Sequence, residues 1–256
     1  MNRTWTFTDL EFVVLWERMR QDFLPAPLTF TSRTPGYYDF LREKADTRDR
    51  LRCTGDDSCD EVFEAMASPD IAIEVHGGVG RADPAASIRM LAVRAGERGY
   101  LITQRPGETV RHSGGFTVTS CTAVGLGPTV VAALPRVGAG SRADIALVAD
   151  SDMDYGYRES RVFDTAADSA ARRSLDFLDH PMIRCGTVDV VQRRSIFGPR
   201  GLTRHRLRWR DLDGDGRYVI DDTRTPVAVP AAADRFTTLI DIRVAAVVRA
   251  IKDEVA

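Results

Sequence analysis

The sequence predicts an α+β fold built on a central, mostly antiparallel β-sheet. The hydrophobic pattern changes from helical spacing to strand alternation at Ile71. The strand candidates that follow are joined by short turns, which favours antiparallel neighbours. Helices followed by strands then occur a second time. We therefore expect one domain with two similar halves, about 1–135 and 160–256, joined by a segment rich in Gly, Ser and Asp.

Composition and charge are those of an ordinary globular protein. The chain has 256 residues, of which 43% are hydrophobic and 28% are charged, and this length can bury a sizeable core. The formal net charge of −2 gives no overall attraction to nucleic acid or to acidic membranes. The longest apolar runs are shorter than the ~20 residues of a membrane-spanning helix. We expect neither nucleic-acid binding nor membrane insertion.

The N-terminal segment and the cysteines predict a cytoplasmic protein. The four cysteines form no CxxC motif, which is typical of free thiols in a reducing compartment, with a Cys53–Cys59 disulfide as the alternative. No cleavable signal is expected, because charged residues interrupt the first apolar stretch at Arg3, Asp9, Glu11 and Glu17.

The first half of the chain predicts helices before strands. Thr8 and Glu11 have the spacing of a capping box, so a helix begins there. It ends at Pro25, before an extended segment over 28–31. Two further helices are predicted over 36–52 and 60–67, the first with an inward face of Tyr37, Phe40, Leu41 and Leu51. Alternation then predicts strands over 71–75, 88–95, 100–105 and 116–121, followed by a helix over 128–134.

The second half repeats this order. Residues 135–160 are rich in Gly, Ser and Asp and are expected to link the two halves. A helix is predicted over 165–178, and an amphipathic helix from Ala232 to about Val255 ends the chain. Between these helices the pattern predicts strands around 187–196, 202–210, 218–220 and 227–229.

The strongest local motif is acidic. Asp211-Leu-Asp213-Gly-Asp215-Gly216, with Asp222 at the twelfth place, matches the spacing of a calcium-binding loop. The twelfth residue is Asp instead of the longer Glu, and the segment before the motif alternates like a strand. Asp and Gly in this order are also typical of a hairpin turn. We interpret the motif as a turn, with a calcium site of Asp211, Asp213, Asp215 and Asp222 as the alternative.

Arginines cluster just before this motif. Alternation along 202–210 places Leu207 and Trp209 on one strand face and four arginines on the other, namely Arg204, Arg206, Arg208 and Arg210. Such a face can contact phosphates of a nucleic acid. We expect instead a solvated sheet face that is balanced by the carboxylates of Asp211, Asp213, Asp215, Asp221 and Asp222.

No motif anchors catalysis. The four histidines are scattered, without the spacing of metal ligands, and no Ser or Cys stretch resembles a nucleophile elbow. We therefore expect a protein that is not an enzyme and uses no cofactor. A hydrolase site assembled across distant strands is the remaining catalytic alternative.

Weaker motifs follow one another in a fixed order along the chain. The first half holds Leu10-Glu-Phe-Val-Val-Leu-Trp-Glu17 and Leu24-Pro-Ala-Pro-Leu28. The second half holds Gly198-Pro-Arg-Gly201, Leu207-Arg-Trp-Arg-Asp211, Gly216-Arg-Tyr-Val219 and Pro230-Ala-Ala-Ala-Asp234. Taken together, this ordered set resembles the EspG family of chaperones from actinobacterial type VII (ESX) secretion systems.

The resemblance implies a sheet with quasi-twofold halves and helical bundles packed beside it. It also implies a cytosolic chaperone that binds the helical tip of the PPE protein in a PE–PPE heterodimer and keeps it soluble. We place the partner-binding residues in the second half, at Gln192, Leu207, Trp209, Phe236, Leu239 and Ile240. An apolar helix stripe of this kind also fits a buried core. The functional alternative is a calcium-responsive regulatory or protein-binding domain.

Overall fold

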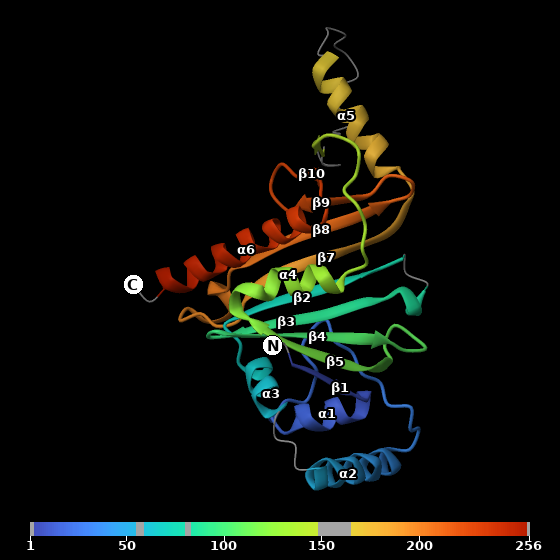
Figure 1. The fold of residues 1–256 in the computed structure, drawn as a ribbon, viewed down its shortest axis with the longest axis vertical. Coiled ribbons are helices and arrows are strands. Elements are labelled where there is room, and N and C mark those ends of the chain that lie inside the picture. The colour runs from blue at the N-terminus through green and yellow to red at the C-terminus, as the bar shows by residue number, and fades with distance from the viewer. Residues whose placement is uncertain (1–2, 55–58, 80–82, 148–164, 255–256) are drawn as a thin grey trace.

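The computed structural model describes residues 3–54, 59–79, 83–147 and 165–254. It contains a ten-stranded sheet in the order β1-β5-β4-β3-β2-β7-β8-β9-β10-β6 (Figure 1). All neighbouring strands are antiparallel. The α+β class with an antiparallel central sheet is therefore confirmed.

The elements have the following bounds. The strands are β1 Thr4–Phe7, β2 Ile71–Gly78, β3 Ile88–Ala95, β4 Arg98–Pro106, β5 Ser113–Thr122, β6 Ile145–Ala146, β7 Met182–Gln192, β8 Arg204–Leu212, β9 Arg217–Asp221 and β10 Val227–Pro230. The α-helices are α1 Asp9–Glu17, α2 Tyr37–Thr54, α3 Asp60–Ala67, α4 Leu126–Ala133, α5 Thr165–Leu178 and α6 Ala233–Asp253.

The strand order repeats about the centre of the sheet. The meander β2–β5 and the meander β7–β10 meet where β2 pairs with β7, from Ile71 opposite Gln192 to Gly78 opposite Cys185. The outermost strand of each meander pairs with a shorter strand from earlier in the chain: β5 with β1, and β10 with β6. A helix follows each meander, α4 after β5 and α6 after β10. The two meanders and the elements beside them thus follow the same order outward from the centre. β6, which flanks the second meander, precedes residue 160, the predicted start of the second half.

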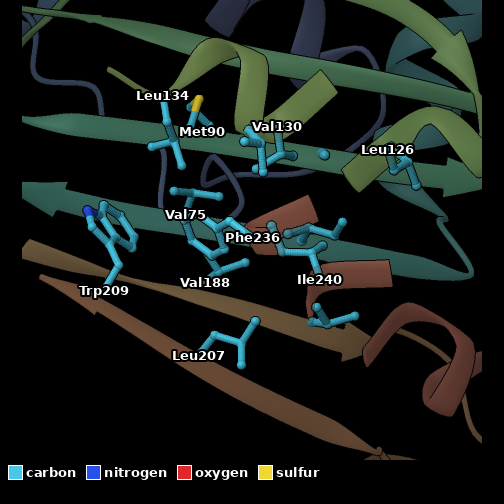
Figure 2. Close-up of a cluster of buried hydrophobic side chains, with 14 of the residues drawn as sticks. Val75, Met90, Leu126, Val130, Leu134, Val188, Leu207, Trp209, Phe236 and Ile240 are labelled. Carbon is cyan, nitrogen blue, oxygen red and sulfur yellow. The ribbon is translucent and has the colours of Figure 1, made fainter. Parts of the chain in front are cut away.

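One face of the sheet is covered by α4 and α6. These two helices contact each other and enclose the largest core cluster with side chains from both halves of the sheet. Figure 2 shows Val130 of α4 and Phe236 of α6 facing Val75 and Val188 of the two central strands. None of the described helices is long and apolar enough to cross a membrane.

The other face is covered mainly in the first half. Ala72 and Ile73 are neighbours in β2 but belong to different core clusters, because successive strand residues point to opposite faces. Phe12 of α1 and Phe63 of α3 pack on this second face in a cluster rich in aromatic rings. In the second half the same face has only a small cluster, which includes Phe177 of α5.

The predicted start of the first helix is confirmed. The Thr8 hydroxyl accepts a hydrogen bond from the Glu11 backbone N–H at 3.2 Å, and the Glu11 carboxylate accepts one from the Thr8 backbone N–H at 2.9 Å. These two bonds form the capping box that the sequence predicts. Phe12, one residue further on, is fully buried. The cap therefore sets the direction in which the helix enters the core.

The predicted inward face of α2 is wrong at two positions. Tyr37 and Leu41 are exposed, because α2 is held to α1 largely by ion pairs. Lys44 Nζ lies 2.7 Å from a Glu17 carboxylate oxygen, and further pairs join Arg48 to Glu17 and Arg50 to Glu11. The remaining inward candidates, Phe40 and Leu51, are half-buried.

Three strand predictions also need correction, one of them at β6, which was not predicted and lies within the expected linker over 135–160. Strand β1 was not predicted, because it has only four residues and passes directly into the cap of α1. Strand β7 begins at Met182 and ends at Gln192, earlier at both ends than predicted, so residues 193–196 lie in a loop. The predicted linker lies partly outside the described residues. Cys53 and Cys59 are not joined in a disulfide.

Candidate protein-binding surface

Most of the predicted partner-binding residues lie in the core. Leu207 and Trp209 of β8 and Phe236 and Ile240 of α6 come together in one cluster, with no exposed area (Figure 2). Leu239 packs against the same cluster and is only half-buried. The apolar stripe of α6 is therefore mainly core.

Gln192 is also fully buried but serves another purpose. Its side-chain amide nitrogen donates to the Arg194 carbonyl at 2.7 Å and to a Glu254 carboxylate oxygen at 2.6 Å. Its amide oxygen accepts from the Thr203 N–H at 3.2 Å. Gln192 therefore fixes the loop between β7 and β8 to the end of α6, away from the other five candidates.

A groove of about 240 Å³ lies beside Leu239, and we call it the Leu239 groove. Leu207 lies beneath it, although its side chain has no exposed area. The remaining lining residues are three valines and four polar or charged residues from β9, β10, the loop between these strands and α6: Val219, Val227 and Val229, and Asp221, Thr223, Thr225 and Arg243. Apolar walls with one charged edge suit an apolar side chain from a partner.

A larger polar pocket of about 420 Å³ adjoins the groove. The two share Asp221, Thr223 and Arg243, and the ion pair between Arg243 and Asp221 stands at their border. The pocket continues to Arg204 and Arg206. The groove therefore opens toward the arginine-rich face of β8.

The predicted alternation along β8 is confirmed. Leu207 and Trp209 are buried, whereas Arg204, Arg206 and Arg208 are exposed. Arg210, the fourth arginine predicted for the solvated face, is half-buried and lies over the Phe177 ring. We call the three exposed arginines, with Asp189 and Glu74, the arginine face. Asp189 is opposite Glu74 in the pairing of β7 with β2, so both carboxylates lie on one face of the sheet.

The arginines on this face are held by carboxylates. Arg206 contacts Asp189 at 2.7 Å, and Arg204 contacts Asp189 at 3.0 Å and Glu74 at 3.6 Å. Burial alone raises the pKa of Asp189, but the hydrogen bonds from Arg206 and Arg204 hold that pKa below its ordinary value. Burial raises the pKa of Glu74, which Arg193 and Arg204 only partly offset.

The expected balance of charge is present, with a different set of acids. Asp189 and Glu74 were not predicted for this role, whereas Asp222 pairs with Arg208 at 3.5 Å as expected. Strand alternation is the signal that could have identified Asp189, because it is a carboxylate among valines in a central strand. These pairs support a balanced sheet face over a phosphate-binding one.

The acidic motif forms the turn between β8 and β9. Gly214 has φ +68° and Gly216 has φ +156°, which favours glycine at both places. Asp211 is fully buried and forms a two-bond ion pair with Arg217, with N–O distances of 2.7 and 2.9 Å. The predicted turn is therefore confirmed, and the Asp211 carboxylate is paired with the buried Arg217.

The calcium alternative is not supported by the turn's geometry. Asp215 accepts from the Ser141 N–H at 2.6 Å and from the Tyr218 hydroxyl at 2.8 Å. Burial raises the pKa of Asp215, but these bonds hold the pKa below its ordinary value. Asp222 lies beyond β9 and pairs with Arg208. Within the described ranges, no three His, Cys, Asp or Glu residues are grouped in a way that could hold a metal ion.

The model of the EspG family matches residues 8–241 of the chain. Among solved structures, the chain is similar to the Mycobacterium tuberculosis type VII secretion system chaperone EspG5 in complex with the PE25–PPE41 dimer. The sequence identity is 13% and the TM-score is 0.58, over 99% of this chain and 96% of that chain. At this identity the likeness shows the fold alone. A search of curated proteins found no match.

Proposed function

Because the chain belongs to the EspG family, we propose that it is a chaperone for a PE–PPE heterodimer in type VII secretion. The observation that carries the proposal is the family match over residues 8–241. The end-to-end likeness of fold to EspG5, a chaperone seen with its PE–PPE dimer, supports it. On this proposal the protein acts in the cytosol by binding, without catalysing a reaction.

We place the partner's helical tip at the Leu239 groove. Leu239 contacts the partner directly, while Leu207, Trp209, Phe236 and Ile240 form the packed base beneath it. A helix is about 10 Å wide with its side chains, so a groove of about 240 Å³ takes single apolar side chains from the tip. The polar pocket and the arginine face then meet the charged rim of the tip.

Co-expression with a PE–PPE pair tests this function. We expect a stoichiometric complex that stays in solution and survives size-exclusion chromatography. Failure to recover such a complex with the pairs encoded beside this gene, while the protein itself is folded, would contradict the chaperone function.

A matched pair of α6 variants tests the surface. Leu239→Asp introduces a charge into the groove and should abolish capture of the PE–PPE pair. Ile242→Asp is the control, because Ile242 is half exposed on the same helix and does not line the groove. If the two variants bind the PE–PPE pair equally well and their thermal unfolding is unchanged, the Leu239 groove is not the partner-binding surface.

A further inference from the structure

The loop between β7 and β8 presents two large apolar side chains together. Ile196 is 69% exposed and Phe197 is 70% exposed. The loop lies at the end of the sheet where α6 ends (Figure 1). Exposed apolar side chains cost little individually. A consecutive Ile–Phe pair at a loop tip, however, forms an exposed apolar patch, and such patches mark places where a protein contacts another surface.

Hydrogen bonds fix this tip. Besides the bonds of Gln192, the Ile196 N–H donates to a Glu254 carboxylate oxygen at 3.0 Å, and the Phe197 N–H donates to the Ser195 hydroxyl at 3.1 Å. Gly201 closes the loop tightly, because a Cβ there would lie 2.7 Å from the Phe197 Cβ. The tip is therefore pre-organised, which reduces the entropy lost when it binds.

Arginines flank the apolar pair on both sides. Arg194 and Arg200 are exposed, and neither has an ion-pair partner in the described part of the chain. Arg193 differs, since it contacts Glu74 at 3.3 Å. The tip thus combines two apolar side chains with two guanidinium groups that no carboxylate of the described residues contacts, beside the Glu254 carboxylate that holds the loop, in a protein whose formal net charge is −2.

The exposed aromatic pair on α2 differs from the loop tip in the charges beside it. Tyr37 and Tyr38 are also consecutive, exposed and in ring contact. They are followed by Asp39, whose carboxylate lies 3.5 Å from Arg42. That surface has no excess of free positive charge. The charge of the loop tip is therefore not a general property of exposed apolar residues here.

We propose that residues 194–200 form a docking tip for an anionic phospholipid surface. Phe197 and Ile196 would enter the interface between headgroups and acyl chains. Arg194 and Arg200 would bind the phosphates, which match the planar guanidinium, and basic residues gain further from the negative surface potential. A tip of residues 194–200 supplies far fewer residues than the roughly 20–30 on each side of a stable protein interface. The proposal is independent of the chaperone function.

Tryptophan fluorescence tests the proposal. Phe197→Trp places a reporter at the tip, and Val124→Trp places one at another highly exposed apolar position, beside α4. We expect the tip reporter to shift to the blue with vesicles that contain phosphatidylglycerol and not with pure phosphatidylcholine vesicles. The Val124 reporter should not shift with either. Equal shifts at both positions, or no shift at the tip, would overturn the proposal.

Vesicle flotation of the whole protein provides the second measurement. Phe197→Ser and Arg200→Glu should each weaken binding to phosphatidylglycerol vesicles by at least about tenfold, and high salt should weaken wild-type binding. Both variants should still form the PE–PPE complex. If Phe197→Ser instead loses that complex and leaves vesicle binding unchanged, the tip belongs to a protein interface and the lipid proposal is wrong.

Discussion

The two halves of the sheet repeat one strand order but differ in what covers their shared second face. In the first half, α1 and α3 bury that face under aromatic rings, and Phe12 stacks on Phe116 with ring centroids 4.1 Å apart. In the second half, the equivalent face holds Asp189 between exposed arginines. One topology can therefore supply a closed core on one side of its centre and an accessible charged surface on the other.

Truncating a buried side chain on the face covered by α1 and α3 should cause the largest loss of stability. Phe12→Ala removes a fully buried ring and should lower the free energy of unfolding by about 3–5 kcal/mol. Chemical denaturation measures the change. Tyr38→Ala, on an exposed ring, is the control and should have almost no effect. A small loss for Phe12→Ala would mean that the aromatic layer contributes little.

A substitution at the centre of the sheet should cause an intermediate loss of stability. A Cβ on Gly186 would lie 2.1 Å from the Trp209 ring, so Gly186→Ala should destabilise the protein by about 1–3 kcal/mol through overpacking. Gly138→Ala is the matched control, because a Cβ there meets nothing within 4 Å. If the two variants unfold at the same denaturant concentration, the Trp209 ring does not pack closely against Gly186.

A substitution in the arginine face should cause a smaller loss of stability, and that loss should depend on pH. Asp189→Asn removes the carboxylate from partly exposed arginines, so we expect a loss of about 1 kcal/mol at neutral pH. The folded-state pKa of Asp189 is lowered. Its contribution is therefore present above the unfolded pKa and lost as pH falls through the folded pKa. Parallel stability–pH curves for wild type and variant at acidic pH would refute this role.

The smallest stability effect is expected at the edge of this face. Arg208 is 45% exposed and pairs with Asp222 at 3.5 Å, so Arg208→Ala should change stability by less than about 0.5 kcal/mol. If the face meets the partner, the variant should still associate more slowly with the PE–PPE pair at low salt. Stopped-flow or biosensor association rates give the measurement, and unchanged rates would remove Arg208 from the binding surface.

The sequence predicted local structure better than it predicted what each surface faces. The capping box at Thr8, the bounds of α3 and α5 and the alternation around Trp209 follow from neighbouring residues alone. Whether Trp209 lies in a groove or a core depends on α6, which joins it from a distant part of the chain. Short-range patterns carry no such information. The sequence therefore placed the partner-binding site on residues that are mostly buried, whereas the structure has a groove at Leu239.

The seam between β2 and β7 also bears on how the protein reaches this structure. Each meander forms between neighbours in sequence, whereas β2 and β7 meet only after a long excursion of the chain. Loop-closure entropy makes such a contact late and slow. Until it forms, both strands have open edges beside apolar residues such as Val75 and Val188. A newly made chain therefore passes through the aggregation hazard from which it is proposed to protect its partner.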